Sequence, residues 1–286
     1  MTAPERPIRD ISDTARWAAL YRARESERKD ALFRDPLARR LAGERGEQID
    51  AALPFSKRHT WSWVTRTYLF DDFIAQEIER GADLVVNLAA GLDARPYRMA
   101  LPPSLRWVEV DLPELIAHKE EALAGAKPAC ALRRIPLDLA DVAARRALFA
   151  ELGRGAERAL VVSEGLIIYL TAEEVGELAR DLAAPPSFRR WVTDLVSPGL
   201  LKLLQKKMGP VLDQASAPLK FAPEEGVEFF ARHGWRPVEV RSMLHAAAGL
   251  GRLPLWMRFF ALFPPPQGPA GARPWSGVCL LEKSGT

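Results

Sequence analysis

The chain has 286 residues, of which 48% are hydrophobic, and this is enough to bury a sizeable core. Its net charge of +3 comes without any run of like charges of the kind that binds nucleic acid. The two cysteines and four histidines have no metal-ligand spacing, and no apolar stretch reaches the length of a membrane span or resembles a signal peptide. We therefore expect a cytoplasmic protein with no metal site, no membrane contact and no nucleic-acid partner.

The first eighty residues predict helices. Asp35 followed by Pro36 is a typical helix start. A single apolar stripe formed by Trp61, Val64, Tyr68, Ile74 and Ile78 predicts a helix that ends near Gly81. We interpret residues 1–80 as an N-terminal helical cap that belongs to a single domain spanning 1–286, and not as a separate domain.

From Asp83 onward, strand patterns alternate with helix patterns, which indicates an α/β fold with a mostly parallel sheet. The expected strands are 84–90, 106–111, 130–136, 159–164 and 189–196. The expected helices between them are 95–100, 113–123, 141–152 and 171–183, the last with a capping box made by Thr171 and Glu174. Residues 81–196 thus form the core of a ligand-binding sheet.

The remainder of the chain has a different pattern. Ser197-Pro198-Gly199 breaks the chain after the fifth strand, and 197–222 is an amphipathic insert at the position of an active-site lid. In the C-terminal part, 223–286, a helix over 223–232 precedes a strand through Val240 and a last strand over 275–281. Two strands without a helix between them predict an antiparallel finish to the sheet, which gives seven strands in all.

Acidic residues follow four successive expected strands. Gly91 and Asp93 follow the first strand, and Asp111, Asp138 and Glu164 end the next three. Open α/β sheets bind ligands at this edge, and a carboxylate twenty residues after a glycine is typical of ribose binding. Taken singly, Gly91 is also compatible with an ordinary turn, and Asp111 with a helix cap ahead of Pro113.

The acidic residues at this edge of the sheet limit the classes of ligand that can bind there. Carboxylates repel phosphate groups, and no Gly-x-x-x-x-Gly-Lys loop is present to offset them. An acidic edge instead suits adenine, ribose hydroxyls and positive charge. S-adenosylmethionine has all three, since it carries a sulfonium and an ammonium group.

The sequence resembles the leucine carboxyl methyltransferase-like class I methyltransferases, including a bacterial branch of O-methyltransferases. The resemblance covers nearly the whole chain and is carried by Asn87–Arg95 (NLAAGLDAR), Glu109–Pro113 (EVDLP) and Ser163–Leu170 (SEGLIIYL). It implies a Rossmann-like fold of seven strands and S-adenosyl-L-methionine as cofactor. Ala89 and Ala94 depart from the family, which usually has Gly-Ala-Gly and Asp-Thr-Arg there, and the extra methyl group of Ala89 is expected to lie near the cofactor.

The resemblance also implies the cofactor-binding residues. Ala89, Gly91 and Asp93 line the methionine end, and Asp111 holds the ribose with Leu112 beside it. Asp138 and Leu139 flank the adenine. Arg66 pairs with the cofactor carboxylate, and Glu164, followed by Gly165, lies near the amino group. From the residues alone, Arg66 also fits a solvated charge on a helix, whereas Glu164 is costly to bury without a partner.

The expected activity is methyl transfer to a hydroxyl or carboxylate of a small molecule, bound between the cap and the insert. A carboxylate needs no general base, and the catalytic residues stay unassigned because His59, His118, His233 and His245 cannot be ranked. Two alternatives are a non-catalytic cofactor-binding protein and a nicotinamide-dependent oxidoreductase, although Gly-x-Gly-x-x-Gly and Tyr-x-x-x-Lys are both missing. We expect a monomer or a weak homodimer.

Overall fold

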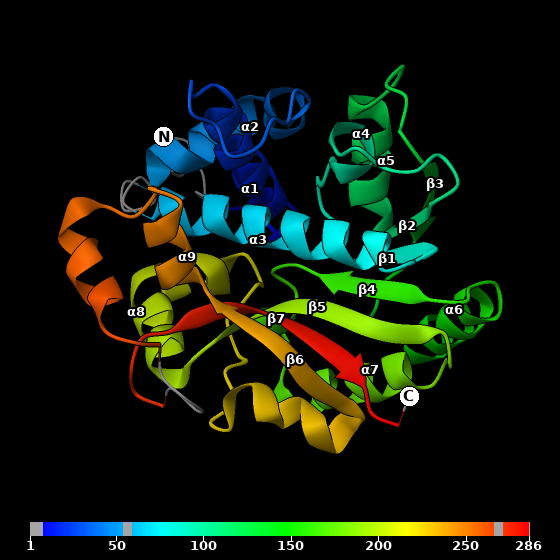
Figure 1. The fold of residues 1–286 in the computed structure, drawn as a ribbon. Helices are drawn as coiled ribbons and strands as arrows, with labels where there is room; N and C mark the ends of the chain where they lie inside the picture. The colour runs from blue at the N-terminus through cyan, green and yellow to red at the C-terminus, as the bar shows by residue number, and fades with distance from the viewer. Residues whose placement is uncertain (1–7, 54–58, 266–270, 286) are drawn as a thin grey trace.

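The computed structural model describes residues 8–53, 59–265 and 271–285, and its centre is one seven-stranded sheet (Figure 1). The strand order is β3-β2-β1-β4-β5-β7-β6, in which the first five strands are parallel and β7 is antiparallel to both of its neighbours. The strands are β1 (Leu84–Leu88), β2 (Arg106–Asp111), β3 (Ala131–Pro136), β4 (Ala159–Ser163), β5 (Phe188–Val196), β6 (Trp235–Ser242) and β7 (Ser276–Lys283). The predicted mostly parallel sheet with an antiparallel finish is confirmed. The expectation that no helix lies between the last two strands is wrong, because Met243–Gly249 and Leu255–Leu262 are helical.

Helices cover both faces of this sheet. Figure 1 shows α3 lying across one face, with the other N-terminal helices beyond it, while α6 and α7 cover the opposite face. The described α-helices are α1 (Ile11–Ser26), α2 (Ala38–Ala52), α3 (Thr60–Glu79), α4 (Arg95–Arg98), α5 (Pro113–Ala122), α6 (Val142–Arg154), α7 (Ala172–Ala183), α8 (Pro198–Gln214) and α9 (Met243–Gly249). The described 3₁₀ helices are η2 (Ile167–Tyr169), η3 (Gly226–His233) and η4 (Leu255–Leu262).

The two faces of the sheet bury alternate residues of each strand. Val85 and Leu160 pack with α3, whose Phe70 and Phe73 are fully buried. Val86 points to the other face and packs with residues of α6, α7 and η3. Because side chains alternate along a strand, apolar residues at successive positions are needed to fill both faces, and this is why four of the five residues over 84–88 are apolar.

The order of strands reverses between β1 and β4, and this places a crevice at their carboxyl ends. β1 has β2 on one side and β4 on the other, so the crossover connections leave in opposite directions from this point. In open α/β sheets, the ligand site lies at such a switch point. Every predicted acidic residue after strands β1 to β4 therefore faces one region.

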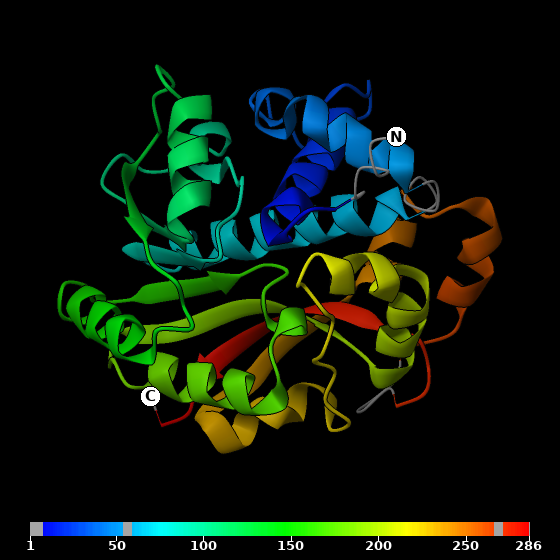
Figure 2. The same cartoon turned by 180° about the vertical axis from the view of Figure 1, so that it is seen from behind.

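The N-terminal cap and the insert share one apolar cluster. Trp17, Tyr21 and Ile49 of the cap pack with Leu201 and Leu212 of α8. Figure 2 shows the ribbon of the insert beneath the N-terminal helices. The insert is therefore a wall attached to the cap, and both cover the same edge of the sheet. Residues 1–7 and 54–58 of the expected cap lie outside the described residues.

Several predicted helix boundaries need correction. Asp35 is not the helix cap, because α2 begins two residues after Pro36 and its cap position is Leu37; the Asp35 carboxylate instead accepts from the Leu37 amide at 3.2 Å. Ser197-Pro198 does not only break the chain: Ser197 caps α8 and Pro198 occupies its first turn. The helix expected over 223–232 is the 3₁₀ helix η3. The capping box of Thr171 and Glu174 is confirmed.

Candidate functional site

A cavity of about 1330 Å³ opens at the carboxyl ends of the parallel strands and continues between the cap and α8. It is lined by all ten residues that the sequence analysis assigned to cofactor binding. They are Arg66, Ala89, Gly91, Asp93, Asp111, Leu112, Asp138, Leu139, Glu164 and Gly165. We call the part that these ten residues line the polar end of the cavity.

Asp111, the last residue of β2, joins two loops of the polar end. One carboxylate oxygen accepts from the Gly91 amide at 2.6 Å, and the other accepts from the Leu112 amide at 2.7 Å. Burial raises the pKa of the Asp111 carboxyl, although the two amides act in the opposite direction. Each carboxylate oxygen can accept more than one hydrogen bond, so Asp111 retains capacity for hydroxyl groups of a ligand.

The loop after β1 has an unusual backbone. Gly91 has φ of 51°, and a Cβ atom there would lie 3.3 Å from the Cβ of Ala15 in α1. Ala89 has φ of 48° and is one of two non-glycine residues with positive φ among those described. This left-handed conformation costs an L-residue roughly 1–2 kcal/mol. The departure of Ala89 from glycine therefore strains the backbone, an effect separate from the position of its methyl group.

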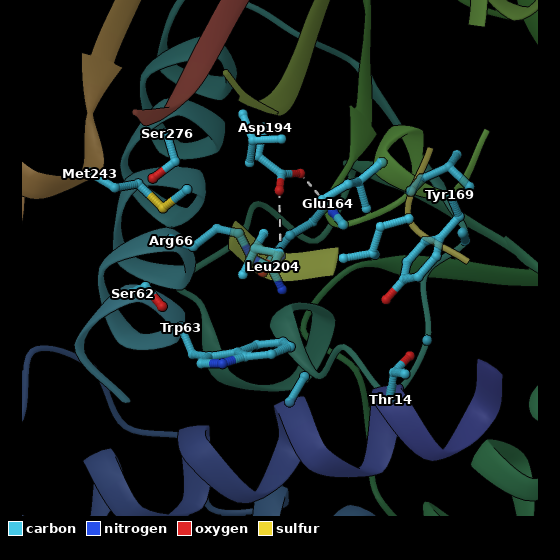
Figure 3. Close-up of a pocket in the computed structure, with 18 of the residues that line it drawn as sticks. Thr14, Ser62, Trp63, Arg66, Glu164, Tyr169, Asp194, Leu204, Met243 and Ser276 are labelled. Carbon is cyan, nitrogen blue, oxygen red and sulfur yellow. Dashed lines mark hydrogen bonds and ion pairs between the residues drawn. The ribbon is translucent and has the colours of Figure 1, made fainter. Parts of the chain in front are cut away.

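Arg66 of α3 is held by two carboxylates and an aromatic ring. Its Nε lies 3.1 Å from Glu164, its Nη1 lies 3.4 Å from Asp194, and its guanidinium stacks on Trp63 (Figure 3). Burial alone would lower the pKa of Arg66, but the two carboxylates raise it above its usual value. Arg66 is therefore not a solvated surface charge.

Gly165 makes room for this guanidinium. It has φ of 67°, and a Cβ atom there would lie 3.1 Å from Nη1 of Arg66. Its amide also donates to Asp194 at 2.6 Å. Glycine at this position thus satisfies both the backbone conformation and the close approach of Arg66.

Arg95 links several carboxylates at the polar end of the cavity. Its side chain is 3% exposed and contacts three carboxylates, those of Asp93 at 2.7 Å, Glu164 at 2.8 Å and Asp71 at 2.6 Å. Asp93 also accepts from the Arg95 amide and from the side chain of Asn87. Burial would raise the pKa of the Asp93 carboxyl, but Arg95 and more distant cations hold it well below its usual range. The expectation that Glu164 needs a partner is confirmed, since two arginines bind it.

The charges of the polar end are only partly compensated. Among the residues that the structure describes, neither Asp111 nor Asp138 has an ion-pair partner, whereas Asp93, Glu164 and Asp194 do. Asp138 is exposed, and its carboxylate accepts from the Ala140 amide at 2.9 Å. Negative charge without a partner therefore remains at the ends of β2 and β3, where the apolar side chains of Leu137 and Leu139 also line the cavity.

The part of the lining that lies between the cap, α8 and the segments around α9 and η4 is largely apolar, and we call it the apolar end. It is formed by Trp61, Leu200, Leu203, Leu204, Met208, Leu212, Met243, Leu244, Trp256, Met257, Phe260, Phe263 and Trp275. A few hydroxyl groups interrupt it, among them that of Tyr169, which Figure 3 shows pointing toward Thr14. Burial raises the pKa of the Tyr169 hydroxyl, although Arg66 and a hydrogen bond with Thr14 oppose this.

The structure separates the four histidines. His59 and His245 line the cavity, whereas His118 and His233 do not. Nδ1 of His245 lies 2.9 Å from the Ser242 hydroxyl, and its Nε2 lies 2.8 Å from the Phe263 carbonyl oxygen. Because a carbonyl only accepts, Nε2 carries the proton and Nδ1 accepts from Ser242 when the ring is neutral.

Three contributors to the site were missed in the sequence. Asp194 interrupts the apolar run of β5, and this pattern of a carboxylate near the end of a buried strand was a usable signal. Arg95 lies in the motif that carried the resemblance but received no role. Trp63 was interpreted as packing; it does pack against Trp17 and Tyr21, and it also supports Arg66.

The described residues contain neither a membrane-spanning helix nor a cluster of metal-ligating side chains. Among the described helices, none combines the length and apolarity that crossing a bilayer requires. Within the same part of the chain, no three His, Cys, Asp or Glu side chains come together as a metal site would require.

Comparison with known families gives a match over residues 15–183 to the leucine carboxyl methyltransferase model. A protein of Parafrankia sp. named "Putative S-adenosyl-L-methionine-dependent methyltransferase" is 32% identical over 261 residues, which cover 83% of this chain and 81% of the relative. A protein of Streptomyces coelicolor with the same description is 32% identical over 249 residues, covering 84% of this chain and 87% of that protein.

Solved structures share the fold at lower identity. A methyltransferase-like crystal structure from Thermobifida fusca aligns with a TM-score of 0.59 and 17% identity over 97% of this chain and 96% of that one. A DUF574 family protein from Streptomyces avermitilis aligns with a TM-score of 0.58 and 16% identity, covering 94% and 97% of the two chains. At this identity the likeness extends to the fold alone.

Proposed function

Because the chain belongs to the leucine carboxyl methyltransferase family, we propose that it transfers a methyl group from S-adenosylmethionine to a hydroxyl or carboxylate oxygen of a small molecule. The observation that carries the proposal is that one continuous cavity has a charged end and an apolar end. Such a cavity accommodates a polar cofactor beside an organic acceptor.

The residues of the polar end fit this cofactor. Asp111 has lone pairs left for two ribose hydroxyls after its two backbone hydrogen bonds. The lack of a side chain at Gly91 lets a ligand approach the loop closely. When bound, S-adenosylmethionine supplies a methyl group that is activated by the adjacent sulfonium.

Each remaining residue has a proposed part. Arg66 binds the cofactor carboxylate and Glu164 the amino group, while Asp138 and Leu139 flank the adenine. Ala89 and Gly91 line the methionine end. Asp93 stabilises the loop that follows β1, because its carboxylate oxygens accept hydrogen bonds from Arg95 and Asn87.

Positioning is the main contribution of this chain to catalysis. Displacement at a methyl group requires the attacking oxygen to lie in line with the bond that breaks, and a rigid site supplies this alignment. The apolar end excludes water, which would otherwise compete as acceptor. A carboxylate acceptor needs no base. For a hydroxyl acceptor, His59 and His245 are the histidines of the cavity lining.

The proposal is tested by calorimetric titration with S-adenosylmethionine, S-adenosylhomocysteine and NADH. We expect binding of the first two and none of NADH. The variant Asp111→Asn should weaken S-adenosylmethionine binding about a hundredfold, because charged hydrogen bonds to the ribose are lost. Asp138→Asn, which changes an exposed carboxylate in the same cavity, should weaken it much less.

The outcomes separate the alternatives. Binding of NADH in place of S-adenosylmethionine would favour the oxidoreductase. Cofactor binding without turnover of any acceptor in a substrate screen would favour a non-catalytic protein. Full affinity in Asp111→Asn, with unchanged thermal unfolding, would show that this carboxylate does not hold the ribose.

A further inference from the structure

The cavity is larger than one cofactor requires. Sites for single small ligands occupy roughly 300–1,000 Å³, whereas this cavity measures about 1330 Å³. Its polar end accounts for the cofactor, so the apolar end has room for a second molecule of considerable size. This step rests on the proposed function.

The chemistry of the lining is divided between the two ends. The carboxylates that line the described cavity come from the loops after β1 to β4, from β5 and from α7. At the apolar end the charged or titratable side chains are those of Lys207, Arg273, His59, His245 and Tyr169, and none of them is a carboxylate. An acceptor whose body carries positive charge therefore lacks a counterion there, while an uncharged or anionic acceptor does not.

Exposed apolar side chains gather at one opening of this cavity. Trp256, Phe260 and Phe263 are 63%, 53% and 56% exposed, and Leu203 of α8 is 42% exposed. All four line the cavity, and we call them the apolar rim. Figures 1 and 2 both show the segment around η4 beside α8 at the outer side of the molecule.

Packing among the residues that the structure describes does not explain the exposure of the apolar rim. No residue of η4 is buried. Large exposed apolar patches are uncommon on monomeric proteins and generally mark binding surfaces. Here the patch is continuous with the apolar end, so one extended molecule can cover the rim and fill the interior together.

We propose that the methyl acceptor is a large amphiphile, with one reacting oxygen near the polar end and an elongated apolar body. That body fills the apolar end and leaves the cavity over the apolar rim. Recognition is by burial of apolar surface, which is not directional, and the length of the apolar body therefore sets the affinity.

A chain-length series tests this. Protein saturated with S-adenosylhomocysteine is titrated with straight-chain carboxylates and 1-alkanols of six, eight, ten and twelve carbons, below their micelle concentrations. We expect the affinity to rise about threefold to fourfold per methylene, as for burial of each CH₂ group. The two head groups show which oxygen, charged or neutral, the site accepts. A flat series for both head groups would overturn the inference.

Two matched variants on η4 locate the apolar body. Trp256→Ser combined with Phe260→Ser changes the rim, whereas Leu255→Ser combined with Leu262→Ser changes residues of the same helix that are 79% and 78% exposed and do not line the cavity. We expect about a tenfold loss for the twelve-carbon probe in the first variant only, because only that variant removes buried contacts. The six-carbon probe should bind both variants as it binds the unchanged protein.

The outcomes distinguish the inference from the function beneath it. Equal losses of affinity for the twelve-carbon probe in both variants would overturn the inference. The exposed apolar side chains would then bind the probe nonspecifically and not as part of the acceptor site. Failure of the unchanged protein to bind S-adenosylhomocysteine would overturn the proposed function. If the protein binds S-adenosylhomocysteine but the affinity does not change with chain length, the proposed function stands. Only the inference that the acceptor is an amphiphile is then overturned.

Discussion

At the polar end of the cavity, charged side chains hold one another in fixed positions, whereas at the apolar end most of the side chains are apolar and are held by packing. Arg66 and Arg95 share Glu164; Arg66 also binds Asp194, and Arg95 also binds Asp93 and Asp71. By contrast, Trp256 and Phe260 of the rim are more than half exposed. The side chains of the polar end are therefore positioned before a ligand binds. The apolar end offers a ligand mainly apolar surface and volume.

This difference fits two kinds of ligand. Hydrogen bonds and ion pairs are directional, so the polar end selects one arrangement of groups, as a constant cofactor requires. Apolar burial tolerates variation in the ligand as long as its volume fits. Substitutions should therefore have large, specific effects at the polar end and graded effects at the apolar end, and the predictions below test this in order of decreasing effect.

The largest effect is expected for Arg95→Met. It leaves three carboxylates around a side chain that is 3% exposed without their common cation. Breaking such a buried network costs roughly 3–5 kcal/mol in the free energy of unfolding. The measurement is denaturant unfolding at several pH values. Without Arg95, burial raises the pKa of the Asp93 carboxyl, so the loss should be smaller at pH 5 than at pH 8.

The control is Arg106→Met, which removes an arginine that is 40% exposed and pairs with Asp83 at the surface. A surface pair of this kind contributes about 0–1 kcal/mol. Equal losses in the two variants, or a loss in Arg95→Met that does not change with pH, would show that the charge network does not hold the polar end together.

A smaller effect is expected for Gly165→Ala, which tests the position of Arg66. The added Cβ would lie 3.1 Å from the guanidinium, in a backbone with φ of 67°. Gly81→Ala is the matched control, because Gly81 also has positive φ, at 93°, but no atom lies within 4 Å of the added carbon. Both variants should lose roughly 1–2 kcal/mol of stability.

Only Gly165→Ala should also weaken S-adenosylmethionine binding, by about tenfold, because it displaces a charged hydrogen-bond donor. Calorimetric titration measures this. If both variants bind the cofactor alike, Arg66 does not bind the cofactor carboxylate.

A gain of stability is expected for Ala89→Gly. Glycine adopts the left-handed conformation at φ of 48° without strain but loses more entropy on folding, so the net gain is about 0.5–1 kcal/mol. Ser216→Gly, at the other described non-glycine residue with positive φ, should give a similar gain. Thermal unfolding measures both. Tighter cofactor binding in Ala89→Gly alone would place the Ala89 methyl group against the cofactor, and unchanged affinity would restrict its effect to folding.

The extent of sequence-based prediction also differs between the two ends. The sheet, its antiparallel finish and the glycine and acids at the polar end could be predicted, because buried strands that end in such residues give local patterns. The other residues of the polar end, Arg66 among them, followed only from the resemblance to a family. The pairing of Arg66 with Glu164 and Asp194 joins residues far apart in the chain, so no local pattern contains it. The apolar end is less predictable still: η4 supplies part of its lining, and an apolar helix that stays exposed has the same sequence pattern as one that is buried.

The smallest effect concerns the attachment of the cap over the polar end. Nε2 of His118 in α5 lies 2.8 Å from Nη1 of Arg16 in α1, so the neutral ring accepts from the guanidinium. Burial and the charge of Arg16 lower the pKa of His118 below its usual value near 6.5. The unfolded chain then takes up a proton at a higher pH than the folded chain. This contribution to stability is complete above about pH 7.5 and is lost as the pH falls below 6.5.

Between pH 7.5 and 5.5 we expect protonation of His118 to lower the melting temperature by about 1–2 °C. His118→Gln should remove this contribution, because an amide oxygen accepts a hydrogen bond from Arg16 and does not titrate. His233→Gln is the control, since the pKa of His233 is also lowered by burial and by neighbouring arginines, but His233 lies on η3, away from the cavity. Helix α1 also covers Gly91 through Ala15. A change in the pH dependence of cofactor affinity should therefore accompany His118→Gln and not His233→Gln, and if neither variant shows it, the cap does not fix the loop after β1.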